Sequence, residues 1–215
     1  MKKFKRLKIG RIFVILTLLS IFILISAISY VDAVSNNIAD SVFRLHVIAN
    51  SDSEEDQKLK LKVRDELLSY MNIISKDSTN KQEAMKIANE HKKELTQIAE
   101  KVIKENGYDY TVNIQVGKAD FPTKYYGDIT LPAGTYDALK VQIGDAKGQN
   151  WWCVMFPPLC FVDVSTGIVP DNSKQELKQS LDDEEYDLIS KTDDNEISFK
   201  FKIVELFQNW RLGNK

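Results

Sequence analysis

The stretch YDYTVNIQVG, residues 108–117, alternates strictly between apolar or aromatic and polar side chains. This period of two is typical of a strand with one buried face. The residues before it follow a different period. From about Thr79, with Gln82 in the capping-box position, to the stop signal Asn106-Gly107, apolar side chains recur at helical spacing, which predicts a long amphipathic helix. Its apolar stripe comprises Ala84, Ile87, Ala88, His91, Leu95, Ile98, Ala99, Val102 and Ile103.

The segment upstream of this helix predicts a strand followed by a first helix. FRLHVIA, residues 43–49, is rich in β-formers, with His46 on the face opposite to the apolar residues. The acidic run of residues 50–56 is a helix-start signal, and apolar side chains then recur at helical spacing up to Ile74. The candidate capping boxes pair Ser51 with Glu54 and Asp52 with Glu55.

Downstream, the period of two returns. TYDALKVQIG and NWWCVMF, residues 135–144 and 150–156, predict two neighbouring antiparallel strands joined by a hairpin turn at residues 144–148. The stretch FPTKYYGDITLPAG, residues 121–134, predicts a loop. The fold class expected is therefore α+β: an N-terminal strand, two long amphipathic helices and then an antiparallel sheet of about three strands.

The N-terminus predicts an export device. Residues 12–31 contain no charged side chain, and six Lys or Arg residues precede them. The apolar stretch is long enough to span a bilayer, and the basic flank would keep its first end in the cytoplasm. Residues 1–33 are thus expected to be a signal peptide or a signal anchor, so that the rest of the chain works outside the cytoplasm. Residues 34–42 predict a short linker or a first helical turn.

The C-terminal part differs in composition from the predicted α+β domain, residues 34–170. Residues 171–196 are strongly acidic, which predicts a solvated helix plus a loop. The last part of residues 171–215 begins with alternation and then becomes helical at Ile203, Phe207 and Trp210. We expect it to be a helical or strand element that docks on the core.

Composition and motifs exclude several functions. The net charge is −2 although six of the 29 basic residues lie in the first eleven positions, so the remaining chain is acidic and lacks the basic patch that nucleic-acid binding requires. The chain contains no phosphate loop, no dinucleotide fingerprint, no G-x-S-x-G and no H-E-x-x-H. The acidic run of residues 50–56 lacks the spacing of a calcium loop. We predict no metal site, no cofactor and no catalytic centre.

Cys153 and Cys160 leave three alternatives open. Their spacing fits neither a C-x-x-C redox motif nor a zinc site. They could form a disulfide around the Phe156-Pro157-Pro158 turn, or remain two packed thiols. Alternatively, Cys153 could be the nucleophile of an exported cysteine hydrolase with His46 as its base.

Aromatic side chains are the better functional lead. Successive side chains of a strand point to opposite faces, so Trp151 and Trp152 cannot both be buried on the same side. One of them could belong to a partner-binding patch, since Trp is enriched at interface hot spots. A further layer of the same domain covering both is the competing interpretation.

Two segments resemble the stage II sporulation protein R family of endospore-forming bacteria. They are FRLHVIANSDSEEDQKLKLKVRDELL, residues 43–68, and LPAGTYDALKVQIGDAKGQNWWCVMFPPLCFVD, residues 131–163. The resemblance implies a signalling protein without catalytic activity, made in the forespore and exported across its membrane into the space facing the mother cell. There it would activate a membrane-embedded aspartic protease of the mother cell, which processes the precursor of a sporulation sigma factor.

No residue role is carried over from the family. The candidates for partner binding are chosen because they are chemically distinctive and lie in the matching segments. They are Arg44, His46, Asn50, Asp52, Trp151 and Trp152, beside the possible disulfide of Cys153 and Cys160. A membrane-anchored structural protein of the septum is a further hypothesis, and it requires that residues 12–31 are retained.

Overall fold

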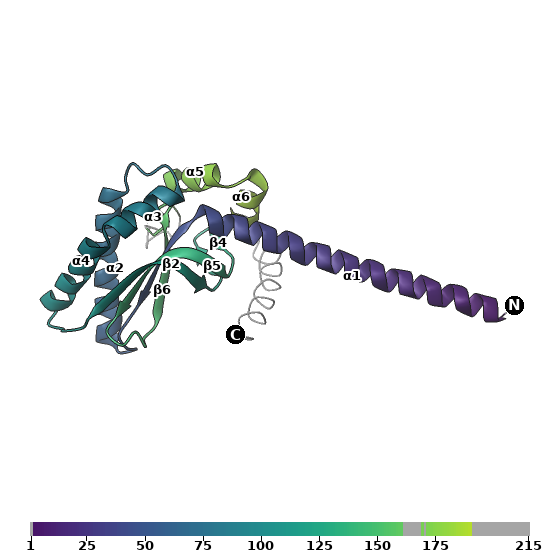
Figure 1. The fold of residues 1–215 in the computed structure, drawn as a ribbon, viewed down its shortest axis with the longest axis horizontal. Coiled ribbons are helices and arrows are strands. Elements are labelled where there is room, and N and C mark those ends of the chain that lie inside the picture. Colours follow the sequence, from purple (N-terminus) through teal and green to yellow (C-terminus); the bar gives the residue numbers. More distant parts are fainter. Residues whose placement is uncertain (1, 161–168, 170, 191–215) are drawn as a thin grey trace.

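The computed structural model describes residues 2–160, 169 and 171–190 (Figure 1). The predicted C-terminal docking element, with Ile203, Phe207 and Trp210, lies outside the described residues. The elements are α1 (Lys2–Ser41), β1 (Phe43–Ile48), α2 (Glu54–Ile74), α3 (Lys81–Glu90), α4 (Lys92–Glu105), β2 (Val112–Phe121), β3 (Lys124–Tyr126), β4 (Ile129–Leu131), β5 (Gly134–Ile143), β6 (Asn150–Phe156), α5 (Asp171–Ser180) and α6 (Asp183–Ser190).

The fold class α+β is confirmed, but the main sheet is mixed. Its strand order is β2-β5-β1-β6, with β1 parallel to β5 and antiparallel to β6. The predicted hairpin between β5 and β6 is wrong, because β1 lies between them. All six residues of β1 are buried, and a strand buried on both faces is stable at the centre of a sheet. The sequence predicted an antiparallel sheet of about three strands, whereas the main sheet is mixed, has four strands and includes the N-terminal strand β1.

The turn after β5 has to reach across β1, and Ala49 and Asn50 hold it there. The backbone N–H groups of Lys147 and Gly148 donate to the carbonyl oxygens of Asn50 and Ala49 at 3.1 and 3.0 Å. A Cβ atom at Gly148 would lie 2.1 Å from the backbone oxygen of Ser51, so only glycine fits this close approach.

Helices α2, α3 and α4 cover one face of the sheet, as Figure 1 shows. Their apolar stripes and the inward strand residues form one core, and each fully buried Leu or Val contributes roughly 1.5–3 kcal/mol. The helical members include Leu59, Val63, Leu67, Leu95, Ala99 and Ile103, and the strand members Leu45, Val47, Leu139 and Val141.

The predicted helix from Thr79 is two helices, α3 and α4, with an irregular residue at His91. Its start is one residue later than predicted, since the side chain of Asn80 accepts from the N–H of Glu83 at 2.9 Å. At the break, the Tyr70 hydroxyl lies 3.0 Å from His91 Nδ1. The first helix α2 likewise begins from Ser53, whose hydroxyl accepts from the Asp56 N–H, and not from either predicted capping box.

The N-terminal helix α1 continues through the expected linker at residues 34–42. Val34, Ile38 and Ala39 near its end are buried in the core, whereas the large apolar side chains between Ile12 and Ile25 are exposed. Among the described residues, no helix has the combined length and hydrophobicity that crossing a bilayer requires. The export helix therefore stays a prediction.

Two further segments differ from the sequence-based expectation. The predicted loop at residues 121–134 contains the two-stranded sheet of β3 and β4, which turns at Gly127 with a φ of 59°. The described part of the acidic segment forms α5 and α6, which dock through the fully buried Leu177 and Ile189 while most of their acidic side chains are exposed. A hydrogen bond of 2.8 Å from Asn37 to Glu185 joins α1 to α6.

Candidate interaction surface on the sheet

Two polar side chains of the central strand lie on the sheet face opposite to the helices. Arg44 and His46 alternate with Leu45 and Val47, which point into the helical side of the core. In the register, His46 is paired with Lys140 of β5 and with Trp152 of β6. The sequence-based placement of His46 opposite to the apolar residues is confirmed.

Arg44 is fully buried but has no carboxylate partner among the described residues. Its Nη2 donates to the Tyr126 hydroxyl at 2.7 Å. The guanidinium carbon lies 4.0 Å from the ring centre of Phe121 and 4.5 Å from that of Tyr136, which are favourable cation–π distances. Its Nε and Nη1 have no hydrogen-bond partner within the described part of the chain. Burial raises the pKa of Tyr126, while the charge of Arg44 opposes that rise.

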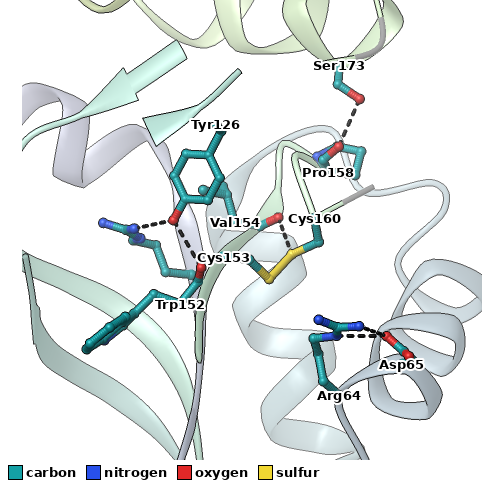
Figure 2. The surroundings of a disulfide bond; sticks show 10 residues. Arg64, Asp65, Tyr126, Trp152, Cys153, Val154, Pro158, Cys160 and Ser173 are labelled. Atoms are coloured by element: carbon teal, nitrogen blue, oxygen red, sulfur yellow. Dashed lines mark hydrogen bonds and ion pairs between the residues drawn. A yellow bond between two sulfur atoms is a disulfide. The ribbon is translucent and has the colours of Figure 1, made fainter. Parts of the chain in front are cut away.

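Strand β3 connects this buried charge to Trp152. The Tyr126 hydroxyl, which accepts from Arg44, donates to the backbone oxygen of Trp152 at 3.2 Å. Figure 2 marks the bond between Tyr126 and Trp152 with a dashed line. Two residues earlier on β3, Lys124 Nζ lies 4.2 Å from the Trp152 ring centre. Burial, and then the charge of Arg44, lowers the pKa of Lys124.

His46 lies beneath the same tryptophan. Its ring stacks on Trp152 with centres 5.8 Å apart, and Nε2 lies 2.7 Å from Asn150 Oδ1. Because an amide oxygen only accepts, the neutral ring carries its proton on Nε2. Burial lowers the pKa of His46; the Asn150 hydrogen bond opposes this, and Lys140 and Arg44 add to it. We refer to Arg44, His46, Lys124, Lys140 and Trp152 as the Trp152 surface.

Asn50 and Asp52 do not belong to this surface. The Asn50 side chain donates to Asp56 at 2.8 Å and accepts from the Asp145 N–H at 3.0 Å, so its polar atoms hold the start of α2 and the turn after β5. Burial raises the pKa of Asp56, but hydrogen bonds from Ser51 and Asn50 outweigh it and the pKa is lowered. Asp52 is exposed before α2.

The two tryptophans lie on opposite faces of the sheet, as predicted. Trp151 is half-buried beside α2, where the Arg64 guanidinium carbon lies 4.2 Å from its ring centre. Trp152 is half-buried on the other face. Only Trp152 is therefore part of the surface that carries Arg44.

Cys153 and Cys160 form a disulfide with their Cα atoms 5.4 Å apart (Figure 2). Of the three alternatives that the sequence left open, the disulfide is the one present. Cys153 is paired with Leu45, whereas His46 is paired with Trp152, so the cysteine and the histidine lie on opposite faces of the sheet. They cannot act as nucleophile and base, and the structure gives no support to the cysteine hydrolase.

The structure also contains a groove that no sequence pattern predicts. This groove of about 570 Å³ lies between α2 and α4, with Tyr70, Ile73, Ile98 and Val102 among its apolar residues. Charged residues of both signs line it too, among them Lys62, Lys101, Asp65 and Glu105. Ile73, near the end of α2, contributes a largely exposed apolar side chain to this groove. Within the described residues, no group of three His, Cys, Asp or Glu side chains is arranged to hold a metal ion.

Comparison with known proteins assigns the family. The profile of the stage II sporulation protein R family matches residues 39–166, which include β1 to β6 and the disulfide. The chain belongs to the stage II sporulation protein R family. It is 37% identical over 152 residues to stage II sporulation protein R of Bacillus subtilis (strain 168), which covers 68% of each chain. No solved structure matches the chain. Family membership supports a role in sporulation.

Proposed function

We propose that this protein is an exported sporulation signal, made in the forespore, that activates a membrane-embedded aspartic protease of the mother cell. The activated protease would process the precursor of a sporulation sigma factor. The protein itself performs no catalysis in this proposal and works by contact in the space between the two membranes. Membership of the stage II sporulation protein R family is the basis of the proposal.

The disulfide of Cys153 and Cys160 is the observation that carries the proposal furthest. Disulfides persist in oxidising compartments and are rare in the cytosol, so the bond supports a site of action outside the cytoplasm. The bond also removes the thiolate on which the competing hydrolase would depend. The uncharged residues 12–31, preceded by basic residues, support export in the same direction.

The mechanism proposed is a shift of the protease between inactive and active states. A signalling protein can favour the active state by no more than the difference between its binding free energies for the two states. A 100-fold shift requires a difference of about 2.7 kcal/mol, which a few well-placed contacts can supply. Among the predicted partner-binding residues, Trp152 has the half-buried aromatic ring that such a contact uses.

The test reconstitutes the full-length protein in vesicles with the protease and the sigma-factor precursor, and follows precursor cleavage. We expect cleavage only when the protein is present. The variant with both Cys153 and Cys160 replaced by alanine should still drive cleavage at temperatures where circular dichroism shows it to be folded. Absence of cleavage with the folded wild type would refute protease activation. Loss of cleavage in the folded variant alone would contradict a purely contact-based signal.

A further inference from the structure

The Trp152 surface carries positive charge that no carboxylate of the described residues balances. Arg44, Lys124 and Lys140 all lie there, and none of them forms an ion pair within the described residues. By contrast, the buried Lys81 has an acid partner, with its Nζ 2.6 Å from an Asp137 carboxylate oxygen. These three cations thus form a local positive cluster in a chain with an overall net charge of −2.

The same surface holds N–H groups without acceptors. The Nε and Nη1 of Arg44 and the indole Nε1 of Trp152 are buried and have no partner within the described part of the chain. Leaving a buried donor unpaired costs stability, and a charged donor costs the most. Aromatic rings beside Arg44 lower this cost without removing it. The positive charge around these groups matches a ligand whose oxygens are ionised.

The accessible part of this surface is formed by Lys124, Lys140 and Trp152, which are half-buried, whereas Arg44 is fully buried. Next to Lys140, the β2 side chain paired with it, Gln115, is exposed and lies on the same face. Lys124 covers the Trp152 ring by a cation–π contact, and no acid in the described part of the chain pairs with it, so a ligand can displace it. The surface thus combines an aromatic ring, movable lysines and amide groups.

We infer that the Trp152 surface binds an acidic peptide segment of a partner protein. Carboxylates of the segment contact Lys124 and Lys140, the positive charge of the buried Arg44 adds to their attraction, and an apolar side chain of the segment packs on Trp152. A nucleic acid would need a more extensive basic patch than these cations supply. A peptide needs only a central aromatic contact with a few charges around it. That the partner is the protease rests on the proposed function; the binding chemistry does not.

The probe is a pool of fluorescently labelled peptides of about ten residues, each with four acidic positions and one apolar position. Fluorescence anisotropy measures their binding to the full-length protein. A second pool with Gln and Asn at the acidic positions is the charge control. We expect the acidic pool alone to bind, and raising the salt from about 50 to about 500 mM to weaken it. The double variant Lys124→Glu, Lys140→Glu should bind at least tenfold more weakly. Trp152→Leu, which keeps both lysines, should weaken binding of the acidic peptides at both salt concentrations.

The matched control is Lys86→Glu, which changes an exposed lysine on α3 and should leave binding within twofold of the wild type. Equal binding by the double variant and this control would overturn the inference, as would equal binding of both peptide pools. Full competition by inorganic phosphate, or tight binding of anionic vesicles that depends on the same lysines, would overturn it in favour of a phosphate or lipid site.

A cleavage assay separates this inference from the proposed function. If the folded double variant loses peptide binding and also precursor cleavage, the acidic segment belongs to the activation step. If wild-type protein binds the acidic pool but never drives cleavage, the proposed function fails and the peptide site stands. If cleavage occurs but no acidic peptide binds, the peptide site fails and the proposed function stands.

Discussion

Replacing Cys153 and Cys160 together by alanine removes the cross-link between β6 and the turn that follows it. The disulfide joins residues with a sequence separation of 7. In the chain-entropy treatment, closing a loop of this size stabilises the fold by about 2.5 kcal/mol, because the unfolded chain has fewer conformations. The lost sulfur of Cys153, which is 2% exposed, adds a smaller packing loss. We therefore expect the variant to lose about 2.5 kcal/mol of unfolding free energy.

Urea unfolding of the oxidised protein, followed by circular dichroism in a mild detergent, measures this loss. With a denaturant dependence of about 2 kcal/mol per molar urea, the unfolding midpoint should fall by about 1.2 M. Wild-type protein that is unfolded, reduced and refolded should match the variant, and the same treatment should leave the variant unchanged. Equal midpoints for oxidised wild type and variant, or a wild type unaffected by reduction, would refute the reasoning.

Three further predictions test other parts of the fold. Gly148→Ala should lower the free energy of unfolding, measured in urea, by about 2 kcal/mol, because the new Cβ would lie 2.1 Å from the Ser51 backbone oxygen. Gly117→Ala is the control and should not destabilise the protein, since no atom lies within 4 Å of a Cβ at that position. Lys81→Met should lower the free energy of unfolding by about 3 kcal/mol, because it leaves the half-buried Asp137 carboxylate with Lys118 as its one ion-pair partner among the described residues. Lys86→Met, at an exposed lysine, should change it by no more than about 0.5 kcal/mol, and equal losses in the two variants would contradict this. Burial holds the pKa of His46 in the folded protein below its ordinary value of 6.5. As the pH falls, the histidine of the unfolded chain therefore binds its proton first. The stability present above pH 6.5 is then lost progressively between pH 6.5 and the lowered pKa of the folded protein. Urea midpoints at pH 7.5 and about 5 should therefore differ less in His46→Gln than in the wild type, and an identical difference would show that His46 does not contribute.

The elements with strong local patterns could be predicted from the sequence. Alternation marked β2 and β5, and helical spacing marked α2 and α4, because a side chain's burial follows the period of its own element. The sequence did not predict correctly which distant segments pair with one another in the sheet. The hairpin between β5 and β6 was a reasonable inference from the intervening turn. However, the position of β1 between them depends on burial of both its faces, which the turn does not report.

The candidate site divides in the same way. Arg44, His46 and Trp152 were singled out as distinctive residues, and the register places all three on one face. Lys124 was missed, since it lies in a segment that the sequence predicts to be a loop. Tyr126 was noted only as one of several aromatic residues, without a partner. Nothing local indicates that the hydroxyl of Tyr126 accepts from Arg44, 82 positions away in the chain. Asn50 was chosen for its chemistry, but its hydrogen bonds show that it holds the backbone.

The position of Arg44 links the fold to the proposed binding chemistry. A charge at the centre of a sheet is among the most costly groups to bury, and here it is held by aromatic rings and one hydroxyl in place of a carboxylate. An acid within the protein at this point would have satisfied the guanidinium and stabilised the sheet, but it would also have neutralised the surface. Because no carboxylate among residues 2–160, 169 and 171–190 balances this charge, a carboxylate bound at Lys124 or Lys140 gains the attraction that an internal acid would otherwise have used. The feature that lowers the stability of the free protein is thus the one that favours an acidic partner.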